Sequence, residues 1–352
     1  MDTEIIKIDR KQMDIDALEK AGNILRGGGL VAFPTETVYG LGANGLDEEA
    51  ARKIYEAKGR PSDNPLIIHI ADLEDLDRIV EEVPEAARRL AAAYWPGPLT
   101  MIFRKSACVP YGTTGGLDTV AVRMPSDEIA REMIRRGGGY IAAPSANTSG
   151  RPSPTTAQHV YEDMDGKIPL ILDGGAVEIG LESSIVDLTT GIPTILRPGY
   201  VSLEMVQEVL GRAEMDRGLI SEDSSVKPKA PGMKYRHYAP KARLKIVEGP
   251  MERVISYIND RADSSKRVGI ICTEETLQKY ACGTIKCIGS RQDELSIASH
   301  LFAVLREFDE DGVEEIYSES FDTPQLGQAI MNRLLKAAGH QRIDVSEIEE
   351  EL

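Results

Sequence analysis

Two cations separated by one glycine, Lys58 and Arg60, are the first residues whose types and spacing suggest chemistry. They follow a predicted helix, so one interpretation is that they stabilise its carboxyl end by about 0.3–1 kcal/mol. The other is a phosphate clamp, because Lys and Arg on a constrained loop can converge on one anion. Asn64 lies further along this loop. His69 lies inside the next predicted strand, where a structural role is commoner than ligand binding.

Arg123 is a cation inside an otherwise apolar segment, Thr119–Met124. The alternation of a strand places it on the face of Thr119 and Ala121, opposite the neighbouring valines. A guanidinium in such a position needs an anionic partner. A structural carboxylate could supply it, and so could the carboxylate of a substrate held by a bidentate fork.

Two segments rich in hydroxyl, amide and glycine residues directly follow predicted strands. They are PTETVYGLG at 34–42, with Thr35 and Thr37, and APSANTSGRPSP at 143–154, with Ser145, Asn147 and Ser153. Such loops can surround phosphates with backbone N–H groups, although a capped turn and a surface loop have similar compositions. Ser183 and Arg197 add a hydroxyl and a cation near later strand ends.

Several common catalytic signatures are missing from the sequence. We find no G-x-x-x-x-G-K-[ST] phosphate loop, no kinase signature, no G-x-S-x-G elbow and no His/Cys metal spacing. The candidate residues therefore favour substrate positioning and charge neutralisation over covalent catalysis.

The elements that must position these residues alternate between short apolar runs and helical patterns. In the first half, strands are predicted at Leu30–Phe33, Leu66–Ile70, Leu99–Phe103, Thr119–Met124, Tyr140–Ala143, Ile168–Gly175 and Ile192–Gly199. Helices are predicted at Asp47–Ala57, Pro84–Tyr94 and Ser126–Arg136, with Asp47 and Ser126 as N-caps and Gly137 as the end of the third. Several connections are too short for helical crossovers, which predicts a mixed sheet.

The second half has a more regular rhythm of strand and helix. Strands are predicted near Leu244–Val247, Val268–Cys272, Ile285–Ile288 and Glu314–Tyr317, and helices near Met251–Arg261, Glu274–Tyr280, Glu294–Phe308 and Gln325–Ala338. This rhythm predicts a small parallel, doubly wound sheet. The dinucleotide-binding G-x-G-x-x-G does not follow its first strand.

Length and charge limit the class of protein. A chain of 352 residues predicts two domains, and residues 211–241 have the composition of a linker. The net charge of −16 disfavours broad binding to nucleic acid or anionic membranes, but it permits a small anion in a local basic pocket. The four cysteines form no Cys-x-x-Cys pair, and we find no signal peptide or membrane span. We therefore expect a reduced, cytoplasmic compartment.

Six motifs occur in a fixed order and together resemble the YrdC-like family of threonylcarbamoyl-AMP synthases: PTETVYGLG, KGRPSDNPLIIHI, AVRMP, APSANTSGRPSPT, ESSIVDL and ILRPG. The later PGMKYRHYAP motif and the α/β pattern after it resemble the long, two-domain form. The resemblance implies an α/β fold with a YrdC-like twisted mixed sheet and helices at 1–211. It further implies a linker acting as an active-site lid at 212–242, and a smaller Rossmann-like doubly wound domain at 243–352.

The same resemblance implies a nucleotidyltransferase activity. L-threonine, bicarbonate and ATP, with Mg²⁺, would give threonylcarbamoyl-AMP and pyrophosphate. A separate transferase complex would then pass the threonylcarbamoyl group to an adenosine in tRNA. Because of the negative net charge, we expect no direct tRNA binding and no membrane partner.

Residue roles follow from the matching motifs. Catalysis would use Lys58, Arg60 and Thr35, and no protein ligand for the metal is predicted. The ATP site would comprise Lys58, Arg60, Asn64, Thr119, Ser145, Asn147, Ser153, Arg197 and Tyr235. The threonine site would comprise Thr37, His69, Arg123, Ala143 and Ser183.

Three other classes remain open. One is a non-catalytic partner protein, which should lack the intact set of cations. Another is an RNA-binding module, which the acidity disfavours. The third is an adenylate-forming carbamoyltransferase of the hydrogenase-maturation type, which uses carbamoyl phosphate. That larger family carries an acylphosphatase-like region and Cys-x-x-Cys zinc motifs, and neither is found in this sequence.

Overall fold

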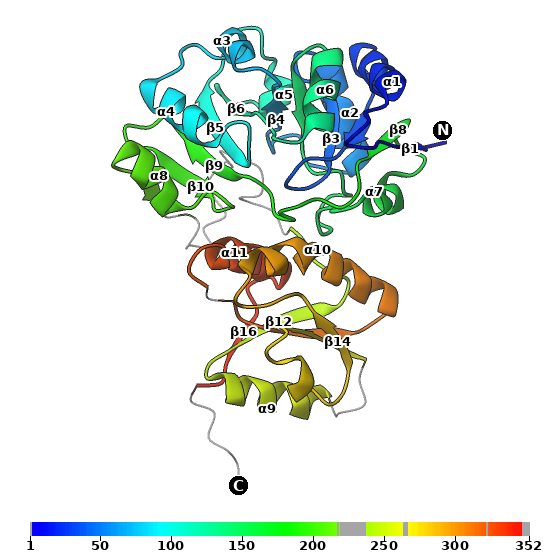
Figure 1. Cartoon of the computed structure of the whole chain (residues 1–352), viewed down its shortest axis with the longest axis vertical. Helices are drawn as coiled ribbons and strands as arrows, with labels where there is room; N and C mark the ends of the chain where they lie inside the picture. Colours follow the sequence, from blue (N-terminus) through cyan, green and yellow to red (C-terminus); the bar gives the residue numbers. More distant parts are fainter. Residues whose placement is uncertain (1, 217, 219–236, 263–266, 322, 347–352) are drawn as a thin grey trace. The chain divides into compact units, whose positions relative to one another are not determined.

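The computed structural model describes residues 2–216, 218, 237–262, 267–321 and 323–346. The chain divides into two compact units (Figure 1). Unit 1 comprises Met1–Ser149 and Ser153–Tyr235, and unit 2 comprises Gly150–Pro152 and Arg236–Leu352. The three residues Gly150–Pro152 therefore belong to unit 2, although their sequence neighbours on both sides belong to unit 1. The division at residues 211 and 242 stays a prediction.

Unit 1 is built on one twisted mixed sheet. Within the described residues its strand order is β1-β8-β2-β3-β7-β4-β6-β5-β9-β10-β11. The strands are β1 (Glu4–Lys7), β2 (Val31–Phe33), β3 (Gly40–Asn44), β4 (Ile67–His69), β5 (Leu99–Arg104), β6 (Thr119–Arg123), β7 (Ile141–Ala143), β8 (Leu170–Asp173), β9 (Ser184–Asp187), β10 (Thr194–Arg197) and β11 (Glu214–Met215). Parallel pairs such as β4–β6 alternate with antiparallel pairs such as β5–β6, so the predicted mixed sheet is confirmed.

Helices flank this sheet, and Figure 1 shows α1 beside α6. They are α1 (Ile15–Arg26), α2 (Glu48–Lys58), α3 (Leu76–Ile79), α4 (Glu85–Tyr94), α5 (Tyr111–Thr114), α6 (Glu128–Arg136), α7 (Ala157–Met164) and α8 (Leu203–Leu210). The predicted helices correspond to α2, α4 and α6. The sequence analysis did not predict β1, β3, β9, β11, α1, α3, α5, α7 or α8.

One N-cap was predicted one residue too early. The cap of α6 is Asp127, whose carboxylate accepts a hydrogen bond from the Ala130 N–H at 3.0 Å, and Ser126 precedes it. Both residue types cap helices, so the sequence alone did not separate two adjacent candidates. The Asp47 cap of α2 is confirmed, since its carboxylate accepts from the Glu49 N–H.

The predicted alternation of β6 is also confirmed. Val120 and Val122 pack into one core together with Trp95 and Phe103. Ala121 packs into another core, with Ile67, Ile102, Ile185 and Leu196. Arg123 follows Ala121 by two residues, so its side chain lies on the second face of the sheet.

Unit 2 has the expected parallel sheet, in the order β14-β13-β15-β12-β16 among its described strands. They are β12 (Arg243–Glu248), β13 (Val268–Cys272), β14 (Thr284–Cys287), β15 (Glu315–Glu319) and β16 (Arg342–Asp344). Figure 1 shows α10 (Glu294–Asp311) and α11 (Gly327–Ala337) on one face and α9 (Met251–Ala262) on the other. Helices on both faces confirm the doubly wound arrangement.

The helix predicted at Glu274–Tyr280 is wrong. This segment contains only a single 3₁₀ turn, Leu277–Lys279. The Thr276 hydroxyl oxygen lies 3.2 Å from the Thr273 carbonyl oxygen and also contacts the carboxylate of Glu319, and its single proton can be donated to either acceptor. Such local side-chain bonds compete with the helical hydrogen-bond pattern, and a segment this short gains little from helix formation.

Candidate functional site

One row of residues crosses the middle of the unit 1 sheet. Each residue of this row is paired in register with the next one on the neighbouring strand. In order, the row contains Ile141 (β7), His69 (β4), Arg123 (β6), Thr100 (β5), Ile185 (β9) and Arg197 (β10). Neighbouring strands lie about 4.8 Å apart. Four polar side chains from distant parts of the sequence are therefore brought into one line across the sheet.

Arg123 is the most extensively bound member of this row, and its exposed fraction is only 4%. Its Nη1 donates to the Thr37 hydroxyl at 2.8 Å, and its Nε donates to the Gly97 carbonyl oxygen at 3.4 Å. Its Nη2 lies 2.8 Å from Oε1 of Glu36. The anionic partner that the sequence demanded is thus a carboxylate of the protein itself.

His69 lies beside Arg123 and is fully enclosed. Its Nδ1 lies 3.1 Å from the Ile67 carbonyl oxygen, and its ring packs edge-on against Phe33. Burial, reinforced by the positive charge of Arg123, lowers the pKa of His69 to about 3. The imidazole is therefore neutral at physiological pH, and it can donate or accept a hydrogen bond without adding charge.

Lys58 organises the segment that follows β7. It ends α2, where Gly59 adopts a left-handed conformation with φ 62°. Its Nζ donates to the Ser145 carbonyl oxygen at 2.5 Å and also to the Asn147 carbonyl oxygen. The Ser145 hydroxyl donates to the Asn147 side-chain oxygen at 2.5 Å. The lysine therefore holds together the hydroxyl and amide groups predicted to bind the nucleotide.

Arg60 is bonded to the segment that leads into β4. Its guanidinium donates to the carbonyl oxygens of Asn64 at 3.3 Å and Pro65 at 3.1 Å. Asn64 is buried, and its side-chain oxygen has no hydrogen-bond partner within the described residues. A buried polar atom of this kind carries a cost that a ligand can offset.

Two further pairs involve predicted residues. Arg197 donates to the carbonyl and hydroxyl oxygens of Ser183 at 3.0 and 3.2 Å, and the Ser183 hydroxyl lies 2.8 Å from that of Thr100. The Ser153 hydroxyl donates to the carboxylate of Glu182 at 2.5 Å. Ser183 is thereby linked to Arg197 and Thr100, two members of the row, whereas Ser153 has a separate partner.

The remaining predicted residues are placed as follows. Ala143 ends β7, opposite Ile67 at the start of β4, and it is buried. Thr119 begins β6, at the end of the strand opposite to Arg123. Tyr235 lies outside the described residues.

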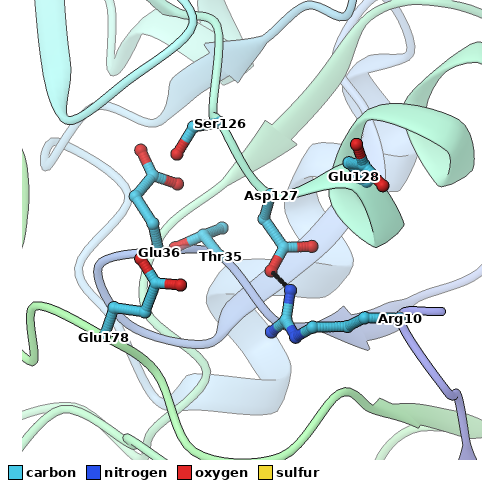
Figure 2. Close-up of a pocket in the computed structure, with 7 residues that line it drawn as sticks. All are labelled: Arg10, Thr35, Glu36, Ser126, Asp127, Glu128 and Glu178. Atoms are coloured by element: carbon cyan, nitrogen blue, oxygen red, sulfur yellow. Dashed lines mark hydrogen bonds and ion pairs between the residues drawn. The ribbon is translucent and has the colours of Figure 1, made fainter.

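An open hollow of about 210 Å³ lies next to Thr35 and Glu36, and Ser126, Asp127, Glu128, Glu178 and Arg10 complete its lining (Figure 2). This volume is below the range of about 300–1,000 Å³ that is typical of small-molecule pockets. Figure 2 shows Arg10 paired with Asp127 on one side and Glu36 and Glu178 on the other. Burial raises the pKa of Asp127, while its hydrogen bond to Arg10 opposes that rise.

Sequence reasoning missed three residues that contact the predicted ones: Glu36, Thr100 and Glu182. Glu36 and Glu182 lie inside the motifs PTETVYGLG and ESSIVDL, and Thr100 is a polar residue in a predicted strand. A polar residue inside a buried strand was the signal that identified Arg123, and it would equally have identified Thr100.

The segment Thr35–Gly40 joins the two halves of the site. Thr37 contacts Arg123, and Gly40 pairs with Ser145 in an isolated bridge. The Ala146 N–H donates to the Tyr39 carbonyl oxygen at 2.8 Å. One short segment therefore links the guanidinium of Arg123 to the loop held by Lys58, an arrangement that fits the class of enzymes that join two anionic substrates.

Comparison with known proteins identifies the family within this class. Residues 23–199 match the Sua5/YciO/YrdC family, described as telomere recombination, and residues 201–339 match the threonylcarbamoyl-AMP synthase C-terminal domain. The chain is 48% identical to the threonylcarbamoyl-AMP synthase of Pyrococcus abyssi over 97% of this chain and 100% of that protein. It is also 48% identical to the Bacillus subtilis enzyme of the same name, over 92% of this chain and 93% of that protein.

A solved structure agrees with these sequence relationships. The crystal structure of P. abyssi Sua5 complexed with L-threonine matches with a TM-score of 0.92 and 47% identity, covering 97% of this chain and 100% of that one. The chain belongs to the threonylcarbamoyl-AMP synthase family, in its two-domain form. The family resemblance, the fold class and the synthase function expected from the sequence are thereby confirmed. None of the described helices is long and apolar enough to cross a membrane.

Proposed function

We propose that this protein is a nucleotidyltransferase that makes L-threonylcarbamoyl-AMP and pyrophosphate from L-threonine, bicarbonate and ATP. The observation that carries this proposal is the segment Thr35–Gly40, which contacts both Arg123 and the loop held by Lys58. One short segment can therefore align a carboxylate-bearing amino acid with a nucleotide. The Pyrococcus abyssi structure supports this proposal, because that protein was crystallised with L-threonine.

The proposed chemistry proceeds through a carbamate. The threonine amine combines with bicarbonate and loses water, and a carbamate oxygen then attacks the α-phosphorus of ATP. The new O–P bond forms as the bond to pyrophosphate breaks. Two anions must approach each other in this step, so fixed cations and hydrogen-bond donors supply most of the catalysis.

The residues divide into two groups under this proposal. Lys58 and Arg60 would hold the nucleotide loop and face the phosphates, and Thr35 would lie near the reacting carbamate. The other nucleotide contacts would come from Asn64, Thr119, Ser145, Asn147, Ser153, Arg197 and Tyr235. The threonine contacts would come from Thr37, His69, Arg123, Ala143 and Ser183.

Mg²⁺ would arrive as part of the ATP substrate, bound to its phosphates. The described residues contain no group of three or more His, Cys, Asp and Glu side chains that could hold a metal. Mg²⁺ commonly binds proteins through substrate phosphates and only one or two carboxylates, which is compatible with this site.

The partners and the compartment are also proposals. The product would pass to a transferase complex that modifies tRNA, and the enzyme would work in the cytoplasm without holding tRNA itself. The net charge of −16 supports the last point, because tRNA binding needs a field of basic residues. Tight, salt-sensitive retention of tRNA in a filter-binding assay would instead favour the RNA-binding module.

The decisive experiment measures pyrophosphate release from ATP. We expect release only when L-threonine and bicarbonate are both present, with L-serine as the comparison amino acid. Carbamoyl phosphate without threonine should give none. Release that depends on carbamoyl phosphate would instead support the carbamoyltransferase alternative, and no release with any combination would refute the proposal.

A further inference from the structure

We infer that Glu36 occupies the substrate-carboxylate position on Arg123, and that L-threonine binds by displacing it, one carboxylate exchanging for another. This inference rests on the proposed function and assigns Glu36 a positioning role in that same site. The guanidinium of Arg123 would then pair with a structural carboxylate in the absence of substrate and with the substrate carboxylate when threonine is bound.

The contact between Glu36 and Arg123 is close but poorly aligned. Nη2 of Arg123 lies 2.8 Å from Oε1 of Glu36, yet neither atom has a hydrogen-bond partner within the part of the chain that the structure describes. Oε2 of Glu36 is equally unpartnered there. Both side chains are buried, with exposed fractions of 5% and 6%. A buried ion pair stabilises a protein only when good hydrogen bonds offset the desolvation of its charges, so this pair is exchangeable.

A substrate carboxylate could make the contact that Glu36 does not. Nε and Nη1 of Arg123 are already directed by Gly97 and Thr37, which fixes the plane of the guanidinium. A free amino acid can orient its carboxylate to that plane, whereas Glu36 is tethered between Thr35 and Thr37. Well-aligned charge-assisted hydrogen bonds are roughly twice as strong as neutral ones. The exchange therefore replaces a misaligned contact with an aligned one.

The open hollow gives Glu36 somewhere to go. Glu36 contacts Arg123 and also lines this hollow, whereas Arg123 is not one of its lining residues. Figure 2 shows Ser126 and Arg10 among the residues that line the hollow together with Glu36. A rotation about the Glu36 side chain would move its carboxylate from the buried contact into this wetter space.

The charges around the hollow would return Glu36 to Arg123 when threonine leaves. Besides Glu36, the lining carries three carboxylates, from Asp127, Glu128 and Glu178, and a single cation, Arg10, which is paired with Asp127. Like charges disfavour a further carboxylate there. Glu36 thus competes with threonine for Arg123. The apparent affinity for threonine equals the intrinsic affinity multiplied by the fraction of molecules in which Arg123 is available.

Isothermal titration calorimetry on the full chain can test this competition. We expect Glu36→Gln to bind L-threonine roughly tenfold more tightly than the unaltered protein, because the competing charge is removed. L-threoninol lacks the carboxylate, so its affinity should change by less than about twofold in the same variant. Glu178→Gln removes one of the charges that return Glu36 to Arg123, so it should also tighten threonine binding, but by less than Glu36→Gln does.

Three outcomes would overturn the inference. Glu36→Gln could leave threonine binding unchanged or weaken it, threoninol could gain as much affinity as threonine, or Glu178→Gln could weaken threonine binding. If Glu36→Gln does not fold, Glu36→Asp, which is one methylene shorter, should still tighten threonine binding several-fold. Pyrophosphate release by the unaltered protein tests the proposed function separately, so the two ideas can fail independently.

Discussion

Arg123 meets a different neighbour through each of its three guanidinium nitrogens, and these neighbours come from separate segments of the chain: Gly97, Thr37 and Glu36. An arginine held in this way has its plane fixed before any ligand arrives. Lysine could not replace it, because an ammonium group lacks the rigid fork that matches a carboxylate. The chemistry of the site therefore depends on side-chain geometry as well as on charge.

Loss of Arg123 and loss of Lys58 should impair the use of different substrates. Arg123→Ala should raise the KM for threonine roughly ten- to a hundredfold, which corresponds to the loss of about 1.5–3 kcal/mol for a charged hydrogen bond. Lys58→Met should instead raise the KM for ATP, because the Ser145–Asn147 loop loses its anchor. Steady-state kinetics with each substrate varied in turn measures both. Exposed Arg104 on the neighbouring strand β5 provides a control, and Arg104→Ala should change neither KM.

His69 should make the protein acid-sensitive. Its pKa is lowered to about 3 in the folded chain, chiefly by burial, whereas an unfolded histidine has a pKa of about 6.5. Between these values the unfolded chain binds more protons than the folded chain. The contribution of His69 to stability is therefore complete above about pH 6.5 and is lost as the pH falls toward 3.

Urea unfolding of the unaltered protein and of His69→Gln at pH 7 and pH 5 checks this dependence. The unaltered protein should lose more stability between the two pH values than the variant does. Equal losses in both proteins would show that other groups carry the acid sensitivity.

The contacts of individual site residues were predictable from the sequence to different extents. Arg123 stood out because a charge in a buried strand is costly and must be compensated. Its actual partner, Glu36, lies 87 positions away in sequence, and only the fold brings the two together. The structure shows Lys58 bonded to the backbone of Ser145 and Asn147, while the nucleotide binding of this loop and the phosphate contacts of Lys58 and Arg60 stay predictions.

At the scale of elements, tight backbone turns place the site residues at the ends of strands and helices. Gly59 ends α2 directly after Lys58, and Gly199 follows β10 two residues after Arg197. They are needed for different reasons. Gly59 has φ 62° with open space where a side chain would be, whereas a Cβ on Gly199 would lie 2.5 Å from the Ser184 backbone nitrogen.

Substitution of these two glycines should separate backbone strain from steric conflict. Gly59→Ala should cost about 1 kcal/mol through its left-handed backbone alone. Gly199→Ala should cost more, about 1–3 kcal/mol, because the main chain beside Ser183 must shift. Chemical denaturation measures both, and the KM for threonine should rise only in Gly199→Ala. A Gly59→Ala variant as damaged as Gly199→Ala would contradict this distinction.

The sequence predicted elements best where apolar periodicity was strong and the ends were marked by caps. It missed β3, since Gly40–Asn44 contains two glycines and resembles a loop. The Glu274–Tyr280 helix failed because threonine hydroxyls there bond locally. The sequence pattern did not predict the strand order, because strand pairing depends on contacts between residues that are far apart in the chain.

At the scale of the whole molecule, the two compact units are not two uninterrupted stretches of sequence. Gly150–Pro152 belongs to unit 2, where the Gly150 carbonyl oxygen accepts from Ala239 at 2.9 Å. The Pro152 carbonyl oxygen accepts from the buried Arg306 at 2.7 Å. This tripeptide lies in the sequence between Asn147 and Ser153, two predicted nucleotide ligands. Two donors of unit 2, Ala239 and Arg306, therefore fix the backbone of this tripeptide.

A chain that ends at Gly211 should consequently be a poor enzyme even if it folds. It would lack the predicted lid and the donors to Gly150 and Pro152. A displacement of about 1 Å in a positioning group can cost on the order of a hundredfold in rate. Pyrophosphate release by the shortened chain measures the loss. A chain ending at Ser346 keeps every described element and serves as the control, and full activity in the chain ending at Gly211 would refute the lid proposal.

The row from His69 through Arg123 and Thr100 to Arg197 also has a consequence for how the enzyme comes into being. Its members enter the sheet on β4, β6, β5 and β10, so no local segment contains a working fragment of the site. During folding, helices form early and long-range strand pairing forms late. A newly made chain thus acquires helical content before it acquires any affinity for its substrates. Substrate binding reports that the central strands of the sheet have assembled.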